Sequence, residues 1–126
     1  MVQVTIVLNK TECLDELLES FVANGISGGT ILDSYGMARS VKNEELNPLF
    51  GILREFIDGD ENHSKIIFMI AEESQIRLIS QIVNKVTGGL QNPNTGIMFC
   101  SPVLYIEGLY KNKTKDDKKD YKKSDN

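Results

Sequence analysis

Residues 87–99, TGGLQNPNTGIMF, are the stretch of this sequence best suited to binding a ligand. Three glycines and an Asn-Pro turn lie between a helix-like segment and a strand-like one. Such a chain can present backbone N–H groups to a phosphate. The stretch contains no Lys or Arg, however, so its backbone would face the charge alone. The alternative is an ordinary helix end followed by a turn, since Gly-Gly commonly terminates helices.

Other reactive side chains do not form a recognisable catalytic or metal site. His63, the single histidine, follows the acidic residues DGDEN. The calcium-loop pattern requires Gly at the position of His63 and Glu at that of Met69, so it fails. Cys13 and Cys100 form no CxxC or Cys/His cluster, and we expect both to be free, buried packing residues. The lack of a nucleophile–base pair argues against an enzyme, and the lack of a His/Cys cluster argues against a metal protein.

Composition favours one ordinary domain. The chain has 126 residues, 40% of them hydrophobic and 25% charged, with a net charge of −4. That charge argues against a nucleic-acid partner, which requires a basic face. No apolar run approaches the ~20 residues that span a bilayer, and the N-terminal residues lack the pattern of a signal peptide. We therefore expect a cytoplasmic protein without direct membrane insertion.

Hydrophobic periodicity predicts the elements that must position the glycine-rich stretch. A helix begins near Thr11 as its cap and ends before Gly25. The predicted elements in chain order are a strand 2–8, that helix, a strand 29–36, a strand 65–72, a helix 74–89 and extended chain 96–109. This order predicts an α+β, ferredoxin-like βαββαβ sandwich, in which an antiparallel sheet carries two helices on one face. The single domain is expected to cover residues 1–110.

Two segments fall outside this scaffold. Residues 37–64 form a loop between the second and third strands, longer than the usual ~4–6 residues. Within it, residues 47–57 read as a short amphipathic helix, which docks on a partner protein or packs on its own oligomer. The apolar residues expected to contact a partner are Leu49, Phe50, Leu53 and Phe56. The tail 111–126 has seven Lys and four Asp, a net charge of +3, and is expected to be disordered and dispensable.

The strands are apolar on both faces. In residues 65–71 and 97–106, apolar side chains occupy successive positions rather than alternate ones. Two helices cover only one face of a sheet, and a second apolar face is rarely left exposed. We therefore expect a homo-oligomer packed through its sheets. The alternative is a monomer whose helix 47–57 covers that face.

The pattern resembles the nitrogen-regulatory P-II family and its PII-like relatives. The residues that carry the resemblance are GGTILDSYGMARS (28–40), a long loop, KIIFMIAEE (65–73), KVTGG (85–89), and TGIMF followed by VLYIEGL (95–109). The resemblance implies a homotrimer that is not an enzyme. It implies a site for adenine nucleotides in clefts between subunits, often with Mg²⁺ and 2-oxoglutarate. It also implies signalling to a protein partner, a membrane transporter or an enzyme, through the long T-loop 37–64.

The family's ligand-binding residues match this sequence in part. Gly36 and Arg39 correspond to the Gly and Arg at the base of the long loop, although Arg39 also suits a solvated loop residue. The glycine-rich loop corresponds to Thr87, Gly88, Gly89 and Gly96. The two arginines of the family's last strand fall on or near Tyr105 and Glu107, which also suit ordinary solvent-facing strand positions.

Charge separates this chain from the family pattern. The basic residue after the closing glycine is Ile97 here, and no loop tyrosine suited to covalent modification is evident in 37–64. Arg39 and backbone amides offset little of the charge of ATP, and Glu107 adds repulsion. We therefore expect a ligand with fewer charges than ATP, or none. CutA-like metal-binding and ACT-like amino-acid-binding proteins remain alternatives on the same fold.

Overall fold

The computed structural model describes residues 1–37 and 63–109. One antiparallel sheet contains four strands in the order β2-β3-β1-β4. The strands are β1 (Val2–Leu8), β2 (Gly29–Tyr35), β3 (His63–Ala71) and β4 (Gly96–Pro102). The helices α1 (Leu14–Ala23) and α4 (Ile76–Thr87) are preceded by the 3-10 turns η1 (Thr11–Cys13) and η3 (Glu73–Gln75).

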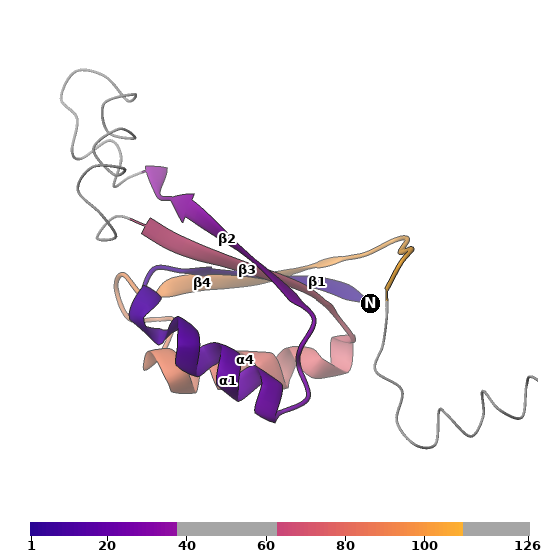
Figure 1. Ribbon diagram of the computed structural model, residues 1–126, viewed down its shortest axis with the longest axis horizontal. Coiled ribbons are helices and arrows are strands. Elements are labelled where there is room, and N and C mark those ends of the chain that lie inside the picture. Colours follow the sequence, from indigo (N-terminus) through magenta and orange to yellow (C-terminus); the bar gives the residue numbers. More distant parts are fainter. Residues whose placement is uncertain (38–62, 110–126) are drawn as a thin grey trace, which may run out of the picture.

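Figure 1 shows α1 and α4 on the same side of the sheet. The α+β architecture is therefore confirmed, and it is consistent with a ferredoxin-like fold. Predicted elements outside the described residues are the helix 47–57, with Leu49, Phe50, Leu53 and Phe56, and the tail 111–126. Arg39 also lies outside them.

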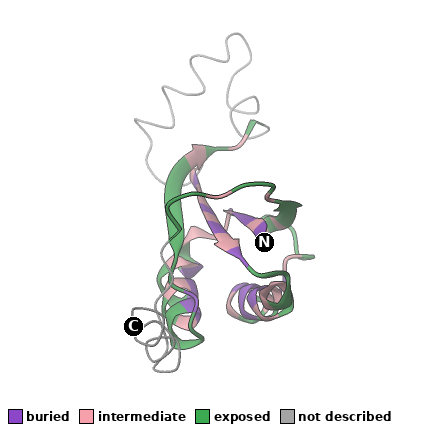
Figure 2. Ribbon diagram, turned by 90° about the vertical axis from the view of Figure 1, so that its right-hand side faces the viewer, coloured by how far each residue is buried: buried purple, intermediate pink, exposed green. Residues whose placement is uncertain are grey.

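The core lies between the sheet and the two helices. Alternate residues of β1 are buried against the helices, and Ile6 and Leu8 have no exposed surface. They pack in one cluster with Leu17 of α1 and Ile79 of α4. Figure 2 shows the resulting alternation along the strands and the buried stripe along the helices. The period of 2 in the strands and 3.6 in the helices thus places apolar side chains in one shared layer.

Four predicted local features differ from the structure. Residues 63 and 64, predicted as the end of the long loop 37–64, are the first residues of β3. Thr11 does not cap α1, because it lies within η1 and the helix begins at Leu14. The extended chain 96–109 is a strand only as far as Pro102, because its partner β1 begins at Val2. Cys100 is exposed rather than buried, whereas Cys13 is buried, and both thiols are free.

The sheet face opposite the helices carries a partly exposed apolar surface, which we call the open face. Its side chains come from rows of paired residues that cross all four strands. One row contains Leu32, Ile66, Val7 and Ile97, and the next contains Thr30, Phe68, Thr5 and Phe99. Ile97 and Phe99 are 56% and 51% exposed. The predicted two-sided apolar character of β3 and β4 is therefore present in the folded chain.

Candidate functional site

The glycine-rich turn 87–96 joins the end of α4 to the start of β4. Gly88 caps α4 in the left-handed conformation, with φ of 86°. Gly96 has φ of 150°, and a Cβ placed there would lie 2.4 Å from the carbonyl oxygen of Val7. A side chain at Gly96 would therefore strain its backbone and overlap the neighbouring strand β1.

Side chains within the turn already occupy several of its backbone groups. The Thr87 hydroxyl donates to the Val83 carbonyl at 2.7 Å and accepts the Gly89 N–H at 3.3 Å. The Leu90 N–H donates to the Asn84 side-chain oxygen at 2.8 Å. A phosphate cradle built on the Gly89 and Leu90 amides would have to replace these contacts.

Lys10 supplies a positive charge beside the turn. This residue follows β1, and its ammonium group donates a 3.1 Å hydrogen bond to the carbonyl of Thr87, which is the last residue of α4. A cation is favourable there because helix carbonyl groups leave partial negative charge at the C-terminus. The sequence prediction missed Lys10, since it considered only cations that the family pattern places at the ligand, such as Arg39. Strand pairing is the signal that could have indicated Lys10, because the end of β1 pairs with the start of β4, directly after the turn.

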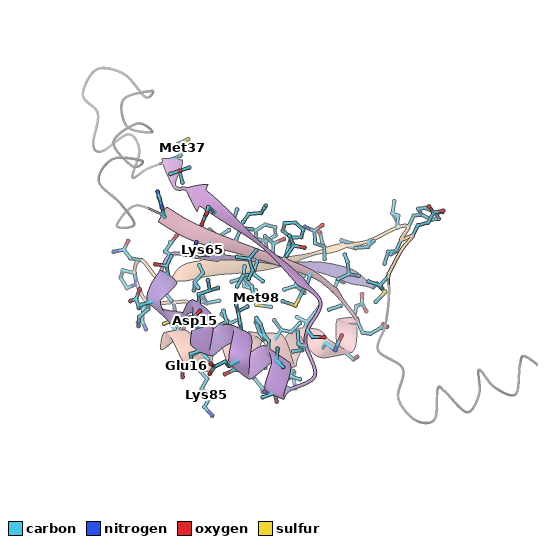
Figure 3. All side chains as sticks on the ribbon, viewed as in Figure 1. Asp15, Glu16, Met37, Lys65, Lys85 and Met98 are labelled. Atoms are coloured by element: carbon cyan, nitrogen blue, oxygen red, sulfur yellow. The ribbon has the colours of Figure 1, made fainter. Side chains whose placement is uncertain are left out.

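The adjoining ends of β2 and β3 carry an ion pair. Asp33 and Lys65 face each other in the ladder and form a salt bridge. The hydrogen bond and charge of Lys65 lower the pKa of the Asp33 carboxyl group. Figure 3 shows Lys65 near the end of the sheet from which β2 continues to Met37. Gly36, a predicted ligand residue, follows β2 directly at this same end.

Strand register places the turn and Gly36 at one end of the sheet, which we call the loop end. Leu8 pairs with Gly96 on one side and with Lys65 on the other, and Lys65 pairs with Asp33. The turn and the end of β2 nevertheless flank opposite edges of the sheet, with β1 and β3 between them. The predicted residues Thr87, Gly88, Gly89 and Gly96 are together, and Gly36 lies across the sheet from them.

Tyr105 and Glu107 lie at the opposite end. Strand β4 runs from Gly96, beside Leu8, to Pro102, beside Val2, and residues 103–109 continue from there (Figure 1). The Tyr105 hydroxyl donates a hydrogen bond to Glu107, which raises the pKa of Tyr105. Within one chain, Tyr105 and Glu107 therefore lie at the other end of β4 from the turn.

A cavity of about 520 Å³ also lies at that opposite end. Residues 25–28, the end of β3 and Leu109 line it, together with Glu72 and Gln75. No residue predicted to bind a ligand lines this cavity.

Within the described ranges 1–37 and 63–109, no group of three or more His, Cys, Asp or Glu residues could hold a metal ion. No helix in these ranges is long and apolar enough to cross a membrane.

Comparison of the chain with protein-family models and with curated protein sequences finds no match.

Proposed function

We propose that this chain is a PII-like regulatory protein, which binds a small ligand between subunits and signals to a protein partner. The observation that carries the proposal is that two features lie at the same end of the sheet, the loop end. The glycine-rich turn and the end of β2, where the segment 38–62 departs, both lie there. A ligand at the turn would thus lie at the same end of the sheet as the origin of the segment that would contact a transporter or an enzyme, with β1 and β3 between the two. We also propose that the chain has the ferredoxin-like βαββαβ order with both helices on one face, as the PII resemblance implies.

The open face supports assembly, and we propose a homotrimer. Ile97 and Phe99 leave about half their surfaces exposed beside the partly buried Ile66 and Phe68. Burying the exposed half of each large side chain contributes about 1 kcal/mol. Several such side chains in one surface favour a second protein surface over water.

Assembly would also complete the ligand site. The turn, Lys10 and Gly36 lie at the loop end, whereas Tyr105 and Glu107 lie at the other end of the same sheet. These groups can therefore contact one ligand only if a neighbouring subunit contributes residues 105–107. This division matches the clefts between subunits that the PII resemblance implies.

The charge at the turn favours a neutral ligand or one with one or two negative charges. Lys10 adds one cation beyond those found in the sequence pattern, but the Thr87 carbonyl already accepts from it. The Gly89 and Leu90 amides donate to side chains, and Glu107 would bring a negative charge. Two or three missing charge-assisted hydrogen bonds, at about 1.5–3 kcal/mol each, would weaken a micromolar ATP site by roughly 3–9 kcal/mol, to a Kd of about a millimolar or weaker over most of that range.

Sedimentation velocity at micromolar concentration tests the assembly. We expect a trimer for the unaltered chain and dissociation for Phe99→Glu, since a buried carboxylate without a partner is costly. Val22→Glu is the matched control, because Val22 is 65% exposed on α1, in the helix layer, and its replacement should leave the trimer intact. A monomeric unaltered chain would refute the proposed trimer.

Calorimetry tests the ligand. The panel is ATP, ADP, AMP, cyclic nucleotides and 2-oxoglutarate, and we expect any ligand that binds to weaken roughly tenfold or more in Lys10→Met. Lys85→Met is the control, because Lys85 lies on α4 and points away from the sheet (Figure 3). Arg39→Ala should abolish binding. Micromolar binding of ATP would contradict the charge argument, and equal loss in both lysine variants would exclude a specific role of Lys10.

A further inference from the structure

A row of polar side chains crosses the loop end immediately beyond the apolar rows of the open face. Ser34 of β2 pairs with Ser64 of β3, and its hydroxyl donates to the Ser64 carbonyl at 3.1 Å. The Ser64 hydroxyl then donates to the side-chain oxygen of Asn9 at 2.6 Å. Ser64 is only 2% exposed. Loss of this bond would therefore leave a buried polar group without its partner, which is costly.

The bond between Ser64 and Asn9 continues the contact between two strands beyond their ladder. The paired residues of β1 and β3 end at Leu8 and Lys65. One residue further along each strand, the side chains of Asn9 and Ser64 join the two segments instead. Their contact lies at the point where β3 begins and where β2 approaches its last residue, Tyr35.

Residues 9 and 10 also hold both ends of the glycine-rich turn. The backbone N–H groups of Asn9 and Lys10 donate to the Thr95 carbonyl, at 3.0 and 3.1 Å. The Lys10 ammonium group donates to the Thr87 carbonyl. Thr87 and Thr95 are 2% and 4% exposed. Because the two threonines at the ends of the turn are buried, displacement of the turn must displace residues 9 and 10 or break the bonds.

We propose that the Asn9–Ser64 hydrogen bond is a positioning contact that couples the turn 87–96 to the paired ends of β2 and β3. A shift of the turn moves residues 9 and 10, and the bond passes this shift to Ser64 and, through its carbonyl, to Ser34. This inference rests on the proposed function in one respect, that the ligand contacts the turn. Occupation of the turn then changes the order of the two strand ends that flank residues 38–62.

Amide hydrogen exchange on four full-length proteins tests the coupling without any ligand. The proteins are the unaltered chain, Lys10→Met, Asn9→Ala and the double variant. Lys10→Met removes the bond to the Thr87 end of the turn and keeps the backbone bonds to Thr95, and we expect it to accelerate exchange at Tyr35 and Ser64 by roughly twofold to thirtyfold, the range for coupled residues. In the Asn9→Ala background the same substitution should cause no further acceleration.

Two controls separate coupling from general loss of stability. Lys85→Met should leave all these rates unchanged, and exchange at the central β1 residues Val4 and Ile6 reports any global destabilisation. Asn9→Asp keeps an acceptor for the Ser64 hydroxyl and should restore the response to Lys10→Met. Independent, additive effects of Lys10→Met and Asn9→Ala, or no response at Tyr35 and Ser64, would overturn the proposal.

The outcomes also distinguish this inference from the proposed function. Coupling in the exchange experiment, with no binding in the calorimetric panel, would leave the positioning contact standing and remove support for the ligand site. Binding that weakens in Lys10→Met, with additive exchange effects, would support the ligand site and refute the contact. Because the exchange experiment uses no ligand, neither result depends on the other.

Discussion

The turn 87–96 and the segment 103–109 flank the two ends of β4, and the chain holds them in different ways. The turn is tied to the chain after β1, to α4 and to itself: Lys10 donates to the Thr87 carbonyl, and the side chains of Asn84 and Thr87 accept from the Leu90 and Gly89 N–H groups. In the segment, Leu104 is fully exposed and Tyr105 is 73% exposed. The hydrogen bonds found for the segment are Tyr105 to Glu107 and the Val103 N–H to the Met1 carbonyl.

This difference suggests different roles for the two regions in a binding site. We expect the turn to keep one shape without a ligand, because several of its polar groups are paired and three of its residues, Thr87, Gly89 and Thr95, are buried. The segment 103–109 lies beyond the start of β1 and pairs with none of the strands in residues 1–37 and 63–109. Its apolar side chains favour contact with another protein surface. A site that uses both regions therefore combines a preformed part with a part completed by assembly.

Replacing the glycine at the β4 start should produce the largest change. Gly96→Ala places a Cβ against the Val7 carbonyl and strains the backbone, so we expect a loss of about 2–3 kcal/mol in the free energy of unfolding. Urea denaturation measures it. Gly108→Ala in the segment is the matched comparison, because Gly108 also has a left-handed φ of 80° but nothing lies within 4 Å of its added Cβ, so only the backbone cost of about 1–2 kcal/mol should remain. Equal losses would remove the distinction between the two regions.

Removing one hydroxyl group from the turn should have an intermediate effect. Thr87→Val conserves shape but leaves the Gly89 N–H without its acceptor, at a cost of about 1–2 kcal/mol. Exchange of the Gly89 amide should accelerate more than that of amides at the centre of β1. Unchanged protection of Gly89 would mean that the Thr87 hydroxyl does not hold the turn.

The smallest effect is expected in the segment 103–109. Glu107→Gln should lower the pKa of Tyr105 toward its ordinary value, since the Glu107 carboxylate retains the phenol proton. In the unaltered chain, the raised Tyr105 pKa stabilises the fold below the unfolded pKa of about 10. This stabilisation is lost as pH rises through the higher folded pKa. Nuclear magnetic resonance titration of Tyr105 measures the shift. A Tyr105 pKa that does not change would show that the two side chains are not bonded in solution.

Local pattern was enough to predict most elements of the described fold. The alternation in residues 2–8 coincides with β1, and the stripe of α4 ends at Gly88 as expected from its left-handed conformation. Boundaries were less accurate where tertiary contacts decide them. The predicted strand continued beyond Pro102, but β1 ends the pairing by starting at Val2. The positions of Arg39 and of the helix 47–57 stay predictions, because they lie outside the described residues.

The sequence by itself determined which residues form strands and helices and which side of each is apolar, because these depend on neighbours along the chain. It also identified the glycine-rich turn. Only the tertiary structure decided what surrounds that turn: Lys10 meets Thr87 across 77 residues of sequence, and Asn9 meets Ser64 across 55. It likewise separated the turn from Tyr105 and Glu107. Periodicity reports the faces of one element, whereas contacts between elements depend on strand order and register.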